Sequence, residues 1–163
     1  MVVEGVTRPV AAPRERHRLR RVLVGFDGSP GAWAALETAI GLAVSERAPL
    51  TIAGVVRRPA WWIGAGPVAV PVTRAGLLRD VERQMEQELA AARDEVPADV
   101  SLTTLLLHGH PGRTLAALAD SGGYDLVVAG PRPTGRLRSL FGGSVTHRLL
   151  ERSNASLLAV KPD

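Results

Sequence analysis

The stretch Asp125-Leu126-Val127-Val128-Ala129-Gly130 places an apolar run directly before a glycine-containing loop. A short apolar run bounded by turn signals is typical of a buried strand. Farther along the chain, Gly143-Ser144 has the composition of a loop that leads into a helix. Many α/β folds hold a phosphate with a strand, a glycine-containing loop and a helix in this order. Backbone N–H groups point into such a loop, and the positive end of the helix dipole favours an anion.

The rest of the chain repeats this alternation of short apolar runs and helical patterns, which predicts a parallel sheet with crossover helices. The predicted strands are 22–26, 50–56, 100–107, 125–129 and 156–160, and the predicted helices are about 30–47, 77–89, 113–120 and 144–152. Ser29 is the expected N-cap of the first helix, with Pro30 at its first position. Five strands with four helices between them predict an α/β fold, a doubly wound five-stranded parallel sheet with helices on both faces.

The positive charge of the chain is concentrated at its beginning. Residues 1–21 contain six arginines and two glutamates, which accounts for the whole net charge of +4. We therefore expect a flexible basic leader over residues 1–19, followed by one domain over residues 20–163. Residues 22–163 are neutral overall, so we expect no nucleic-acid partner for the domain, although a basic arm could also touch RNA, DNA or an acidic protein.

Composition excludes several other classes of protein. No apolar stretch approaches the roughly 20 residues needed to span a bilayer, and no signal-peptide core is present, so we expect a cytoplasmic protein without membrane association. Cysteine is absent, which excludes disulfides, thiolate chemistry and cysteine-based zinc sites. His108 and His110 have no nearby third ligand, and we interpret them as loop residues rather than a metal site. Trp61 and Trp62 lie between predicted elements and favour a hydrophobic plug over the sheet, although they could instead form an exposed platform for a partner or a ligand.

Ligands of open α/β sheets bind beyond the carboxyl ends of the strands, where the strand order reverses. Asp27 follows the first strand and could accept hydrogen bonds from ribose hydroxyls, or it could merely support the turn and cap the helix. Val55 ends the second strand, where its backbone could meet a base edge; the same position suits a core valine.

The phosphate loop combines favourable and unfavourable residues. Gly143 and Ser144 offer close backbone approach and first-turn N–H groups, and Arg132 could reach phosphate oxygens as a forked donor. Pro131 and Pro133 have no N–H to donate, and proline fixes φ near −65°. The loss of two charge-assisted contacts would cost roughly 1.5–3 kcal/mol each.

From Arg21 to Lys161 the chain resembles a single domain of the universal stress protein family. The matching features are Val24-Gly25-Phe26-Asp27-Gly28-Ser29, Gly109-x-Pro111, the stretch 125–130, and Gly143-Ser144-Val145-Thr146. The loop spacing is similar to the Gly-x2-Gly-x9-Gly-Ser signature of the ATP-binding branch, with Pro133 in place of the second glycine. The resemblance implies that ATP is bound, with or without Mg²⁺.

The resemblance also implies roles for individual residues. Asp27 would contact the ribose and Val55 would meet adenine through its backbone. The phosphates would be held by Gly130, Gly143, Ser144 and Val145. A homodimer would form through the last strand, about Ser156 to Val160, because an exposed apolar edge strand needs pairing.

We therefore expect a homodimeric, adenine-nucleotide-binding stress-response module with a regulatory rather than a catalytic role. One alternative is a nucleotide-free dimeric scaffold that acts through protein partners, which Pro133 favours. Another is a weak ATP-hydrolysing enzyme, for which the sequence offers no convincing general base or metal-binding carboxylate near the loop. We expect no metal site and no catalytic residue.

Overall fold

The computed structural model describes residues 18–57, 72–130 and 155–162 of the 163-residue chain. The described strands form one parallel sheet: β1 (Val22–Phe26), β2 (Leu50–Val56), β3 (Leu102–His108), β4 (Leu126–Ala129) and β5 (Ser156–Ala159). Their order in the sheet is β3-β2-β1-β4-β5. The order reverses between β1 and β4, so the doubly wound α/β fold is confirmed.

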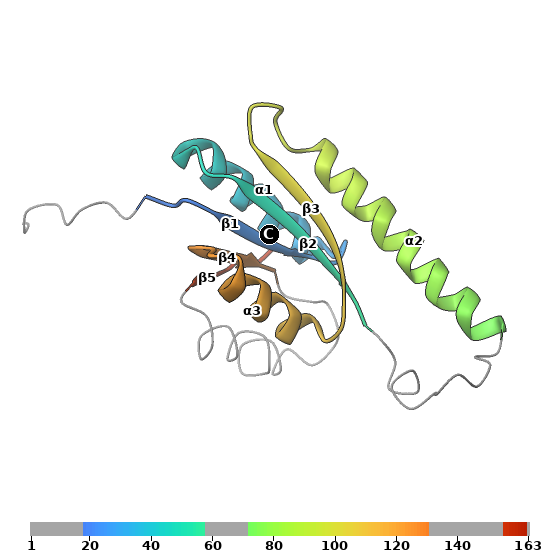
Figure 1. The fold of residues 1–163 in the computed structure, drawn as a ribbon. Helices are drawn as coiled ribbons and strands as arrows, with labels where there is room; N and C mark the ends of the chain where they lie inside the picture. Colours follow the sequence, from blue (N-terminus) through green and yellow to red (C-terminus); the bar gives the residue numbers. More distant parts are fainter. Residues whose placement is uncertain (1–17, 58–71, 131–154, 163) are drawn as a thin grey trace, which may run out of the picture.

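The three helices of the described residues cover the two faces of the sheet (Figure 1): α1 (Pro30–Glu46), α2 (Val72–Asp94) and α3 (Pro111–Ser121). One apolar cluster joins α1 and α2 to alternate residues of the central strands, such as Val24 and Ile52. A second cluster joins α3 to the residues between them, such as Leu23 and Ala53. Because successive side chains of a strand point to opposite faces, the apolar runs of β1 and β2 serve both clusters. The predicted helix 144–152 and Trp61-Trp62 lie outside the described residues.

Local signals in the sequence explain why α1 begins where it does. The Ser29 hydroxyl accepts a hydrogen bond from the Ala32 N–H at 3.2 Å, and Pro30 stands at the start of the helix. The serine cap and the proline at the first position were both predicted. A serine cap pairs an N–H group that the helix leaves free, and proline has no N–H group that would need a partner. The helix ends at Arg47, whose left-handed backbone (φ 52°) closes the last turn.

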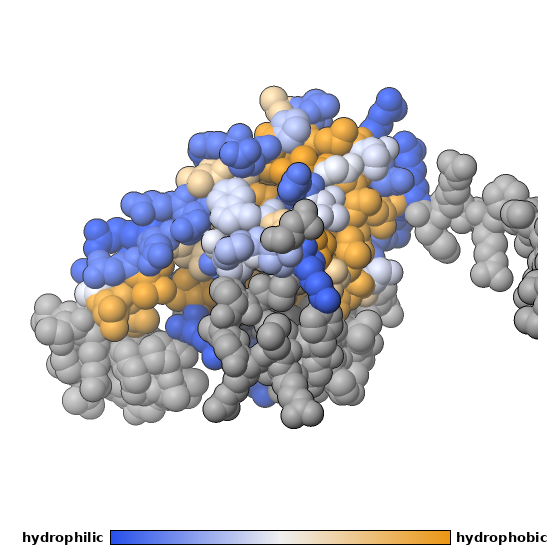
Figure 2. Space-filling model, turned by 180° about the vertical axis from the view of Figure 1, so that it is seen from behind, coloured by the Kyte–Doolittle hydropathy of each residue, from blue (hydrophilic) through white to orange (hydrophobic). Residues whose placement is uncertain are grey.

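The apolar side chains of α2 are buried only toward the C-terminal end of the helix. Leu89 packs in the core and Met85 packs against it, whereas Leu77 and Val81 are 63% and 42% exposed. With Val44 on α1, they are the large apolar side chains that the described part of the chain leaves exposed. Figure 2, which shows the molecule from behind, likewise displays apolar side chains between hydrophilic ones.

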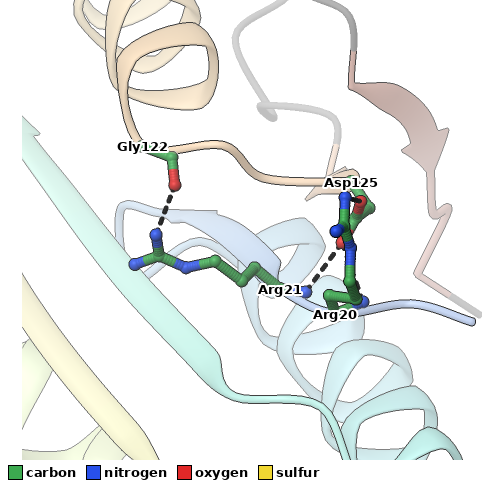
Figure 3. Close-up of polar contacts among 4 residues, drawn as sticks. All are labelled: Arg20, Arg21, Gly122 and Asp125. Carbon is green, nitrogen blue, oxygen red and sulfur yellow. Dashed lines mark hydrogen bonds and ion pairs between the residues drawn. The ribbon is translucent and has the colours of Figure 1, made fainter.

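Polar contacts fasten the start of β1 to the start of β4 (Figure 3). Asp125 Oδ2 accepts hydrogen bonds from the backbone N–H groups of Arg20 at 2.7 Å and Arg21 at 2.9 Å. The Arg21 guanidinium donates to the Gly122 carbonyl and lies 4.8 Å from the ring centre of Tyr124. Since both strands begin here, these contacts fix the amino edge of the sheet, opposite to the edge where ligands bind.

Candidate functional site

The candidate site lies at the carboxyl ends of β1 and β4, which are neighbours in the sheet although their connections run in opposite directions. The turn Asp27-Gly28-Ser29 leaves β1 and leads into α1. Asp27 Oδ1 accepts a hydrogen bond from the Ser29 N–H at 3.2 Å, and Gly28 has a positive φ of 73°. Asp27 therefore supports the turn, as one of its two predicted roles requires, and it stands at the predicted edge of the sheet.

Gly130 directly follows β4 and lies against the first turn of α1. A Cβ atom at Gly130 would come within 1.8 Å of the Gly31 carbonyl oxygen. The absence of a side chain thus lets the end of β4 approach the backbone of α1. Asp27 and Gly130 thus lie at the carboxyl ends of two neighbouring strands, β1 and β4, as predicted from the sequence.

Val55 lies one residue past the end of the β1–β2 pairing, whose last pair is Phe26 with Gly54. Its side chain is 7% exposed and packs in the cluster on the α3 face, so it is a core valine. The Val56 carbonyl accepts a hydrogen bond from the Gly109 N–H, on the β3 side. Because backbone groups alternate in direction along a strand, the Val55 carbonyl points to the opposite side, toward the space beyond β1.

The part of the site that would hold the phosphates lies outside the described residues. This applies to Arg132, Gly143, Ser144 and Val145, and also to Pro133. The structure therefore brings together Asp27, Gly130 and the Val55 backbone, and it leaves the loop residues as predictions.

Helix α2 contributes two residues, Met85 and Glu88, that the sequence analysis did not assign to the site. A side chain at Gly54 would meet the Met85 sulfur at 2.9 Å, and one at Gly28 would meet the Glu88 carboxyl carbon at 2.8 Å. Met85 and Glu88 therefore lie over the ends of β2 and β1, respectively. Met85 belongs to the apolar repeat that predicted the helix, and Glu88 follows it by three residues, a spacing that puts both on one face of a helix.

At the end of β3, a histidine side chain contacts a carboxylate of α2. His108 Nε2 lies 2.7 Å from Glu82 Oε1 on α2, with about a third of each side chain exposed. His108 is the last residue of β3 and not a loop residue, which corrects the sequence interpretation; pairing with Val56 extends the strand to it. The described residues include no group of three histidine, aspartate or glutamate side chains that could hold a metal ion. Among the described helices, none is long and apolar enough to cross a membrane.

The strand order, the turn after β1 and the close approach at Gly130 define a Rossmann-like α/β domain, a class of fold that binds its ligands at the switch point. The sequence model of the universal stress protein family matches residues 18–161. The chain therefore belongs to the universal stress protein family.

Similarity to individual proteins agrees with this assignment. The chain is 32% identical to the stress response protein NhaX of Bacillus subtilis (strain 168), covering 86% of this chain and 97% of that protein. A universal stress protein in complex with cAMP matches 90% of this chain and 99% of its own, with 24% identity and a TM-score of 0.59. The universal stress protein from Archaeoglobus fulgidus in complex with dAMP matches 88% of this chain and 99% of its own, with 18% identity and a TM-score of 0.55.

Proposed function

We propose that this universal stress protein is a cytoplasmic homodimer that binds an adenine nucleotide and acts in the stress response as a regulator rather than as an enzyme. The observation that carries the proposal is that Asp27, Gly130 and Val55 lie at the carboxyl ends of three neighbouring strands, β1, β4 and β2, around the switch point of the sheet. This edge of a doubly wound sheet is where such folds bind nucleotides.

Ligands of related folds support the adenine nucleotide. One similar structure holds cAMP and another holds dAMP, which have in common an adenine base and a single phosphate. The two ligands differ at the sugar, since dAMP lacks the 2′-hydroxyl and the 3′-oxygen of cAMP belongs to the cyclic phosphate. We extend the proposal to ATP, with or without Mg²⁺, because the chain retains Gly130, Gly143 and Ser144 of the family signature.

Residue roles in the proposed complex follow from the family resemblance and from the site. Asp27 would contact the ribose and the Val55 backbone would meet the adenine. Gly130, Gly143, Ser144 and Val145 would surround the phosphates, and Arg132 would donate to phosphate oxygens.

Calorimetric titration of nucleotide-stripped protein with ATP, with and without Mg²⁺, tests the proposal. We expect a dissociation constant in the micromolar range and loss of binding in Gly143→Val, because a branched side chain would occupy the space that a phosphate needs. Gly41→Ala is the matched control, since Gly41 lies on the exposed side of α1 with no atom within 4 Å of an added Cβ.

Pro133 favours one competing function, a nucleotide-free scaffold that acts through protein partners. Absence of heat and of a thermal shift at millimolar ATP would support the scaffold. Multiple turnovers of ATP that are lost in Asp27→Asn would instead support a weak hydrolase.

A further inference from the structure

Helix α2 places a second carboxylate beside the turn that follows β1. A Cβ atom at Gly28 would lie 2.8 Å from the carboxyl carbon of Glu88 and 2.9 Å from its Oε2. The Glu88 carboxylate therefore lies over the turn, at the residue that directly follows Asp27. The packing of Met85 and Leu89 against Gly54 fixes this part of α2 on the sheet.

The Glu88 carboxylate has no polar partner among the residues that the structure describes, although its side chain is only partly exposed. The positions one turn away on α2, Gln84, Met85, Ala91 and Ala92, provide no cation. Glu82, on the same helix, is by contrast paired with His108. A partly buried carboxylate without a donor is costly, because it loses water and gains nothing in return.

Asp27 already has a structural task at this end of the sheet, since it accepts the Ser29 N–H and makes a further contact. Glu88 is thus a second acceptor beside Asp27, which the proposed function already assigns to the ribose. A carboxylate accepts hydrogen bonds from hydroxyl groups and repels phosphate. In a nucleotide, the groups that donate hydrogen bonds as hydroxyls are those of the sugar.

We infer that Glu88 is a specificity-determining residue that accepts a hydrogen bond from a ribose hydroxyl of the bound nucleotide and so selects ribonucleotides over deoxyribonucleotides. The inference rests on the proposed function, because it assumes that a nucleotide occupies the switch point. Glu88 acts on the sugar alone and leaves the base and the phosphates to other groups. The same carboxylate disfavours a nucleotide that carries a phosphate on its 2′-oxygen.

The test measures the dissociation constants of AMP, 2′-deoxy-AMP and 3′-deoxy-AMP for the full-length wild type, Glu88→Gln, Glu88→Ala and Glu86→Ala. We expect the wild type to bind 2′-deoxy-AMP roughly tenfold more weakly than AMP, as for a lost hydrogen bond to a charged group, and 3′-deoxy-AMP about as tightly as AMP. In Glu88→Ala, AMP should weaken to the level of 2′-deoxy-AMP, whose own affinity should stay unchanged. Glu86 is exposed on the same helix, and its removal should leave the preference intact.

The outcomes separate this inference from the proposed function. If all three nucleotides bind the wild type equally, or if Glu88→Ala weakens all three by the same factor, nucleotide binding stands and the role of Glu88 is wrong. If no adenosine monophosphate binds the wild type at millimolar concentration, the proposed function is wrong and this inference with it. Glu88→Gln keeps the shape of the side chain, and its melting temperature checks that a changed preference does not arise from a damaged fold.

Discussion

At the scale of single residues, the contact between Gly130 and Gly31 is the strictest requirement at the candidate site. A Cβ atom added to Gly130 would lie 1.8 Å from the Gly31 carbonyl oxygen, so the end of β4 or the start of α1 must shift to admit any side chain. We expect Gly130→Ala to lower the free energy of unfolding by about 1–3 kcal/mol, the usual cost of overpacking. Urea unfolding measures this change.

Gly41→Ala provides the control for that prediction. Gly41 is exposed within α1, and no atom lies within 4 Å of an added Cβ. Alanine favours a helix over glycine by about 0.5–1 kcal/mol, so this variant should be slightly more stable than the wild type. Equal stabilities of the two variants would mean that Gly130 and Gly31 do not approach closely.

Pro133 is the residue on which the strength of triphosphate binding depends, as judged from the sequence. Pro133→Gly restores one backbone N–H, and a hydrogen bond to a charged group contributes roughly 1.5–3 kcal/mol. We expect ATP to bind about tenfold or more tightly to this variant, with little change for adenosine, which has no phosphate. Calorimetry with both compounds checks the prediction, and a parallel gain for adenosine would contradict it.

The residue scale also shows where sequence reasoning was sufficient. Ser29 and Pro30 act on atoms within three residues of themselves, so their roles could be predicted from spacing alone. Gly31 and Gly130 are far apart in the sequence, and no local pattern indicates that they touch. Glu88 was missed for the same reason, since its place over Gly28 depends on how α2 packs on the sheet.

At the scale of elements, α2 combines a well-packed half with an exposed half. The repeat of Leu77, Val81, Met85 and Leu89 every four residues predicted a helix, and the helix is confirmed, but the repeat says nothing of how far the sheet extends beneath it. Leu89 is 6% exposed, whereas Leu77 is 63% exposed. The sequence could therefore predict the element but not the length over which it is buried.

The same contrast gives a prediction for stability. Leu89→Ala should cost about 2–5 kcal/mol, because it leaves a cavity in the core between α2 and the sheet. Leu77→Ala should stay within about 0.5 kcal/mol of the wild type, as surface substitutions usually do. Thermal and urea unfolding of both variants test this; a large loss for Leu77→Ala would show that something covers the exposed half of α2.

At the scale of the whole molecule, the parallel sheet has two edges, β3 and β5, and the proposed homodimer uses β5. Sequence alternation predicted the sheet because each strand and helix carries its own pattern. The order of pairing shows which strands lie at the edges, but neither that order nor the sequence alternation shows what pairs with an edge strand. The side to which each backbone group of β5 points can nevertheless be assigned from its hydrogen bonds to β4.

The N–H groups of Ser156 and Val160 donate to the carbonyls of Asp125 and Ala129, at 2.8 and 3.0 Å. Because backbone groups alternate in direction along a strand, the N–H of Ala159 points away from β4, toward the open edge. Ala159 is itself exposed. Proline at this position removes a hydrogen-bond donor from the edge and none from the β4–β5 ladder.

Ala159→Pro should therefore convert the proposed dimer into a monomer with little loss of folded structure. Ala159→Val, which keeps the N–H and favours a strand, should remain dimeric. Size-exclusion chromatography with light scattering gives the mass of each, and circular dichroism shows whether each is folded. A folded Ala159→Pro dimer would place the interface elsewhere, and a monomeric wild type would refute the homodimer. Dissociation in Ala159→Pro alone would assign the interface to the edge of β5.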